Sequence, residues 1–172
     1  MSITPEKIKL EGEFYINGNL VSSKLEVSMG VVCNFLEVKL VDKNCWLTLY
    51  TFNPFMRDAL GSPISEPIEY SFEGTRLGLL NENFSSDPRE PEFYNRIVKK
   101  IYIKIEHKKD CIQYNLRGLS LAPEKSEYHE KTNPPGNWEF ECNFSINTKD
   151  LQSALGLYPE RAEKLIKEMS TL

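Results

Sequence analysis

Few residues of this chain have the types and spacing that catalysis or metal binding requires. The run Glu127-Tyr128-His129-Glu130 sets two carboxylates beside an imidazole. A metal site, however, needs ligands that converge from several elements at about 2.0–2.2 Å. The other histidine, His107, falls in a lysine-rich turn and is expected to be solvated. No H-E-x-x-H spacing occurs, so we assign no metal ligand and no cofactor.

The sequence also lacks a recognisable nucleophile. It has no G-x-S-x-G turn and no glycine-rich loop that leads from a strand into a helix. Four cysteines are spread along strand-like runs without a C-x-x-C pair: Cys33, Cys45, Cys111 and Cys142. Burial on an apolar face raises a thiol pKa, and a reducing compartment keeps such thiols free. We therefore assign no catalytic residue.

The charge balance argues against nucleic acid as a partner. Acidic residues number 25 and basic residues 21, whereas a nucleic-acid binder needs a basic face. The strongest counter-argument is the strand face that carries Lys100, Tyr102 and Lys104, because base-stacking platforms have this mixture. Lysines on an outer strand face also simply discourage edge pairing. The acidic balance favours that second interpretation and disfavours attachment to an anionic membrane.

The expected location is the cytoplasm. The first residues lack the apolar run of a secretory signal. No stretch approaches the ~20 apolar residues of a spanning helix. We therefore expect no contact with a membrane.

Alternation of apolar and polar residues, which is typical of half-buried strands, covers most of the chain. In 8–16 the even positions are apolar or glycine, and Asn17-Gly18 then predicts a type I′ hairpin. Further strand-like runs lie at 25–31, 36–40, 45–52, 68–72, 97–106, 112–116 and 138–146. The alternation predicts eight or nine strands between about residues 6 and 146.

The period changes to helical near the end of the chain. Leu151, Ala154 and Leu155 form a short apolar stripe that Gly156 can terminate, and Pro159 suits the first position of a second helix. These signals predict helices within about 148–170. The fold class is therefore mainly β, an antiparallel sandwich or barrel with a short C-terminal helical pair, as a single β-rich domain over 1–172.

Two long predicted loops, 81–95 and 121–137, carry aromatic residues among charges and prolines. Long loops without regular structure tend to be functional, and aromatic anchors with a polar rim are typical of interfaces. The candidate binding residues are Phe84, Phe93, Tyr94, Tyr128 and His129. If these residues only seal the core, the interface is expected on the outer face around Lys100, Tyr102 and Lys104 or on the helical tail.

The first hypothesis is a non-catalytic protein-interaction or assembly module whose partner is another protein or a second copy of the chain. One alternative is a β-barrel that binds an apolar small molecule, as a carrier or a lyase-like protein. The strand predicted over 45–52, apolar on both faces, is the feature that favours it. The other alternative is an enzyme with a dispersed site, which sequence motifs do not reveal.

Overall fold

The protein was analysed as a computed structural model that describes residues 7–30, 35–50, 67–74, 76–83, 89, 93–124 and 131–172. Within these residues the strands are β1 (Ile8–Ile16), β2 (Asn19–Gly30), β3 (Phe35–Leu40), β4 (Cys45–Leu49), β5 (Ile68–Glu73), β6 (Gly78–Asn83), β7 (Phe93–His107), β8 (Cys111–Ser120) and β9 (Trp138–Asn147). A 3₁₀ turn, Thr148–Asp150, precedes the helices α2 (Leu151–Leu155) and α3 (Pro159–Met169).

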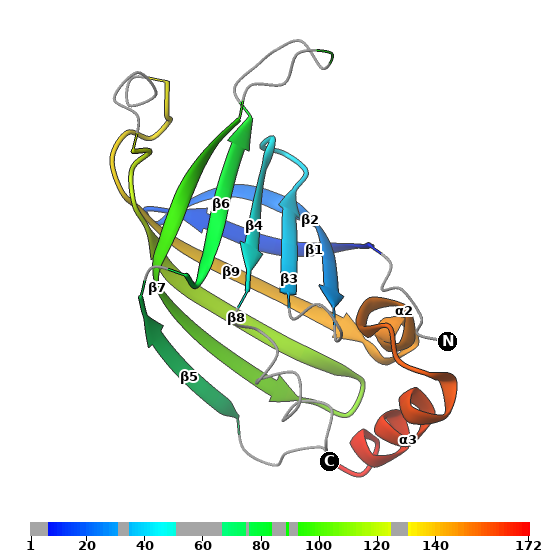
Figure 1. Ribbon diagram of the computed structural model, residues 1–172. Coiled ribbons are helices and arrows are strands. Elements are labelled where there is room, and N and C mark those ends of the chain that lie inside the picture. The colour runs from blue at the N-terminus through cyan, green and yellow to red at the C-terminus, as the bar shows by residue number, and fades with distance from the viewer. Residues whose placement is uncertain are drawn as a thin grey trace.

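Eight of these strands close into an antiparallel barrel (Figure 1). Their order around the barrel is β7-β6-β4-β3-β2-β1-β9-β8, and β8 pairs back onto β7. This closure decides between the two predicted architectures in favour of the barrel. The ninth described strand, β5, lies outside the closed ring and pairs with β7 alone.

Strand β7 is the longest strand described and has pairing partners along both edges. On one edge its first part, Phe93 to Ile97, pairs with β6, and its second part, Lys100 to Ile105, pairs with β5. On the other edge it pairs with β8, with a register shift between Val98 and Lys100. A bulge at this point bends the strand where its neighbour changes.

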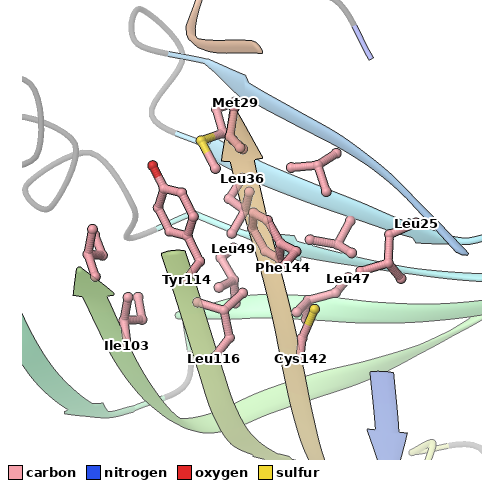
Figure 2. Packing of buried hydrophobic residues seen from close by; sticks show 14 of the residues in the cluster. Leu25, Met29, Leu36, Leu47, Leu49, Ile103, Tyr114, Leu116, Cys142 and Phe144 are labelled. Atoms are coloured by element: carbon pink, nitrogen blue, oxygen red, sulfur yellow. The ribbon is translucent and has the colours of Figure 1, made fainter. Parts of the chain in front are cut away.

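Inward side chains from alternate strand positions fill the barrel interior. Figure 2 shows Leu47, Tyr114 and Phe144, from β4, β8 and β9, pointing into the same space. The rings of Tyr114 and Phe144 stack with their centroids 5.0 Å apart. Burying each such side chain stabilises the fold by roughly 1.5–3 kcal/mol.

The predicted hairpin between the first two strands is confirmed. Asn17 has φ 49° and Gly18 has φ 80°, which are the two positive angles that a type I′ turn requires. The turn joins β1 to β2, which pair over Ile8 to Ile16. Asn17 also accepts a hydrogen bond from the backbone N–H of Glu139, so the turn is fixed to β9.

The predicted helical pair is also confirmed. Gly156 ends α2 in the left-handed conformation with φ 61°, and Pro159 begins α3. Helix α2 packs against β2 and β9 at one end of the barrel, and α3 buries Ala162, Leu165 and Met169. None of the helices in the described ranges is long and apolar enough to cross a membrane.

Two predictions were wrong about the strand ends. The loop predicted over 81–95 is wrong at both ends, because β6 continues to Asn83 and β7 already begins at Phe93. His107, predicted to be solvated in a turn, is a buried residue at the end of β7. It follows Ile103 and Ile105 at alternate positions, so strand geometry directs its side chain inward.

We expect Leu165→Ala to lower the free energy of unfolding by about 2–4 kcal/mol, because this side chain is buried against the core. A helix as short as α3 is marginal in water by itself, so packing must hold it in place. Urea unfolding followed by circular dichroism measures the change. Glu163→Ala, on the exposed face of the same helix, is the control. Equal stability of the two variants would show that α3 is not docked.

Candidate binding surface

Two rows of side chains cross the outer face of β5, β7, β8, β9 and β1. The strand registers place the members of each row opposite one another. The first row is Ser71, Tyr102, Arg117, Glu141 and Tyr15. The second row is Glu69, Lys104, Asn115, Asn143 and Glu13. We call the surface formed by these two rows the outer groove.

The outer groove is hollowed. Two adjoining depressions of about 1060 Å³ and 730 Å³ lie over these strands. Both are lined by Tyr102, Arg117 and Glu141, so the two depressions meet at the first row. A partner seated on this row could therefore reach into both depressions.

Contacts between neighbours hold the side chains of the outer groove in place. The guanidinium of Arg117 lies over the ring of Tyr102, with its Cζ 4.2 Å from the ring centroid. Asn115 Nδ2 donates to Glu141 Oε1 at 3.0 Å and also to Asn143 Oδ1. An ordered tyrosine and arginine lose little conformational entropy when a partner binds.

Both tyrosines of the first row remain neutral hydrogen-bond donors. Tyr15 donates its hydroxyl hydrogen to Glu13 Oε2 at 2.8 Å, and this bond raises the Tyr15 pKa. Desolvation raises the pKa of Tyr102 most, and a hydrogen bond with Glu69 raises it further. Since the usual value is already 10.0, neither phenol ionises near neutral pH.

The outer groove and its margins are acidic. Seven carboxylates line the two depressions: Glu11, Glu13, Glu69, Glu73, Glu106, Glu139 and Glu141. The basic side chains that line them are Lys100, Lys104 and Arg117. Lys100 and Lys104 each lie 4.0 Å from a glutamate, Glu73 and Glu69 respectively. Carboxylates thus outnumber basic side chains by seven to three, and the surface attracts cations.

Of the predicted binding residues, the structure describes Phe93 and Tyr94, and it does not place these two side chains together. Phe93 is 46% exposed at the start of β7, whereas Tyr94, next along the strand, is only 3% exposed. They therefore lie on opposite faces of the barrel wall. Phe84, Tyr128 and His129 lie outside the described residues, as does the whole acidic–histidine run 127–130.

Strand β4 was predicted to be apolar on both faces, and the structure shows that its second apolar face is the outward one. Trp46 is half-buried and packs edge-on against Phe93, with ring centroids 5.1 Å apart. Tyr50, just beyond the strand, is 50% exposed. These aromatic side chains face outward, so they do not line the interior of the barrel. Phe52 lies outside the described residues.

Tyr94 belongs to a buried polar cluster, which we call the end cluster: Lys43, Glu82, Tyr94, Arg96 and Trp138. The Tyr94 hydroxyl donates to Glu82 Oε2, and Lys43 Nζ lies 3.2 Å from Glu82 Oε1. Desolvation and the bond to Glu82 raise the pKa of Tyr94 well above its usual value. This tyrosine is consequently a neutral donor inside the barrel.

Arg96 is the central member of the end cluster. It is fully buried, and its Cζ lies 3.6 Å from the centroid of a Trp138 ring. Arg96 Nη1 donates to the Gly136 carbonyl at 2.7 Å, and Trp138 Nε1 donates to the Pro134 carbonyl at 2.6 Å. These bonds fix the segment before β9 against the barrel. Burial lowers the Arg96 pKa, but a guanidinium titrates so high that it remains charged.

Sequence reasoning missed the end cluster. The alternation Tyr94, Arg96, Val98 places all three side chains on the inner face once β7 is known to begin at Phe93. Had the strand been predicted to begin at Phe93 and not at residue 97, the alternation would have directed Arg96 inward. A buried arginine requires a partner for its charge. Its acidic neighbour Glu82, and Lys43, which pairs with Glu82, come from distant segments that only the pairing of β4, β6 and β7 brings together.

The cysteines that the structure describes are free thiols. Cys45 and Cys142 are buried, and Cys111 is partly exposed. Desolvation raises the pKa of Cys45 to about 12, and it raises that of Cys142 further. Neither thiol is a thiolate near neutral pH. Cys33 lies outside the described residues.

Within the described ranges, no group of three or more histidine, cysteine, aspartate or glutamate side chains is arranged to hold a metal ion.

Comparison of the chain with protein-family models, with curated proteins and with solved structures gives no match. Function must therefore be argued from the surfaces themselves.

Phe93 and Tyr94 are expected to respond differently to truncation. Tyr94→Ala should lower the free energy of unfolding by about 3–5 kcal/mol, because it leaves a cavity and removes the hydrogen bond to Glu82. Phe93→Ala should cost about 1 kcal/mol or less, because its ring is half exposed. Chemical denaturation measures both changes. Similar losses would mean that Phe93 is also part of the core.

Proposed function

We propose that this protein is a non-catalytic binding module whose partner is another protein, and that the outer groove is its recognition surface. The single observation that carries the proposal is the row Tyr102–Arg117–Glu141, which lies where the two depressions meet. Tyrosine and arginine are the side chains that dominate binding energy at protein interfaces. Here both are ordered before any partner arrives.

The charge of the outer groove favours a protein over a nucleic acid. Seven carboxylates against three basic side chains repel phosphates. The same surface attracts lysine and arginine side chains, because opposite charges steer encounter between proteins. This charge distribution agrees with the acidic balance of the whole chain.

A carrier of apolar molecules is less well supported. The aromatic residues Trp46 and Tyr50, in and just beyond β4, face outward, and the inward positions of this strand belong to the packed core.

A second copy of the chain remains a candidate partner. The predicted loop residues stay a prediction, with Phe93 as the exposed aromatic that could add a contact at the other end of β7. The buried free thiols suit a cytoplasmic protein, which is the location we propose.

The test compares what immobilised wild-type protein and two variants retain from a native extract of the source cells. The double variant Tyr102→Ala/Arg117→Gln removes the ordered pair from the outer groove. Lys39→Ala, on the outer side of β3, is the matched control. Quantitative mass spectrometry should find a partner that wild type and the control retain and the double variant loses at least tenfold, about 1.4 kcal/mol.

The double variant should remain folded, because the two substituted side chains lie on the outer face of the barrel. Thermal unfolding checks this. An identical set of retained proteins for all three would contradict the outer groove as the binding surface. Phe93→Ala is added to the same experiment, and loss of a partner in this variant alone would move the interface to the start of β7.

A further inference from the structure

Strand β5 has one edge that the described residues leave open. Each of the eight barrel strands has a described neighbour on both edges, whereas β7 is the only described strand that pairs with β5. Figure 1 shows β5 as the outermost strand beside the lower part of the barrel. Its Glu69, Ser71, Phe72 and Glu73 are exposed. An open strand edge is a template for another strand.

The register shows which backbone groups point to the open edge. Gly74 N donates to Lys99 O at 3.0 Å, in line with the pairing of Glu73 with Lys100. Bonded and non-bonded pairs alternate along an antiparallel ladder. Phe72 and Tyr70 therefore bond to β7, and the N–H and C=O groups of Glu69, Ser71 and Glu73 point away from it.

The two faces of β5 differ in chemistry. Glu69, Ser71 and Glu73 share the outer face with the outer groove. Tyr70 and Phe72 share the opposite face, and Phe72 is 38% exposed. A strand added at the open edge would set alternate side chains beside these two rows. Basic residues suit the acidic row, and apolar residues suit the aromatic row.

We propose that an extended segment of a partner protein, alternating basic and apolar residues, binds by adding a strand to the open edge of β5. This inference rests on the proposed function and names how the partner is held. Backbone hydrogen bonds to Glu69, Ser71 and Glu73 supply the affinity, and the alternating side chains supply the selectivity. Basic side chains on the outer face then reach the carboxylates that line the outer groove.

A second copy of the chain fits this edge less well. Its own β5 would carry the same acidic row, so a pair centred on Ser71 would set Glu69 opposite Glu73. Like charges directly opposite each other on a sheet are destabilising. A basic partner segment meets no such repulsion.

The test uses a fluorescein-labelled peptide with blocked ends in which lysine and valine alternate. Fluorescence anisotropy with the full-length protein should show saturable binding that weakens as salt is raised. A peptide with glutamate in place of lysine should not bind. Ser71→Pro removes the N–H that points to the open edge and leaves the bonds to β7 intact, as proline does on edge strands. This variant should bind the lysine peptide at least about tenfold more weakly, whereas Lys39→Ala, on the outer side of β3, should bind it like wild type.

A charge reversal keeps the test independent of proline. The double variant Glu69→Lys/Glu73→Lys alters exposed side chains only, and it should bind the glutamate peptide and release the lysine peptide. Circular dichroism melting of every variant confirms that each is folded. Unchanged preference in the reversed variant would overturn the proposal.

Other outcomes also decide the matter. Equal binding of the lysine peptide to folded Ser71→Pro and to Lys39→Ala, or no binding to wild type, would overturn strand addition. Binding lost in Tyr102→Ala/Arg117→Gln but kept in Ser71→Pro would retain the outer groove and reject the open edge. Binding that both variants keep would contradict the outer groove as well. A dimer seen by light scattering that Ser71→Pro abolishes would assign the edge to a second copy instead.

Discussion

The fold depends on the backbone pairing of β7. This strand bonds to β8 from Val98 to His107 along one edge, and to β6 and then β5 along the other, so it is the strand at which the ring closes. Closure satisfies the backbone groups of eight strands at once, which an open sheet cannot do. Because β6 ends its pairing at Ile97, the rest of that edge is available to β5. The open edge of β5 is a consequence of this division.

The end cluster shows how the barrel accommodates charge beside its closure point. A buried guanidinium is costly unless its charge and hydrogen bonds are compensated. Glu82 and Tyr94 lie beside Arg96, the ring of Trp138 packs on it, and the Gly136 carbonyl accepts a hydrogen bond from Nη1. Arg96 Nε and Nη2 have no hydrogen-bond partner among the described residues, so the compensation is partial. These contacts join β6, β7 and the start of β9. They are a structural assembly, whereas the ordered charges of the outer groove remain accessible to a partner.

Much of the fold could be predicted from the sequence, because it follows from local signals. Alternation of apolar residues indicated most strands, Asn17-Gly18 the first turn, and Gly156 with Pro159 the helix ends. Strand β6 was missed since its inward positions are Gly78, Leu80 and Glu82, which do not form an apolar stripe. The choice between barrel and sandwich depends on which distant strands pair, and alternation carries no information about that. Of the outer groove, the sequence indicated only the face of β7 that carries Lys100, Tyr102 and Lys104. Arg117, Glu141 and Tyr15 lie on other strands, and only the strand register shows that they stand beside Tyr102.

Amide hydrogen exchange of the free protein, resolved by NMR, tests the open edge of β5 most directly. Amides that bond across a ladder exchange slowly, and amides that face solvent exchange at nearly the unprotected rate. The account predicts alternation along the strand, with slow exchange at Tyr70, Phe72 and Gly74 and fast exchange at Glu69, Ser71 and Glu73. Equal protection of Ser71 and Phe72 would contradict it, because β5 would then have a pairing partner on both edges.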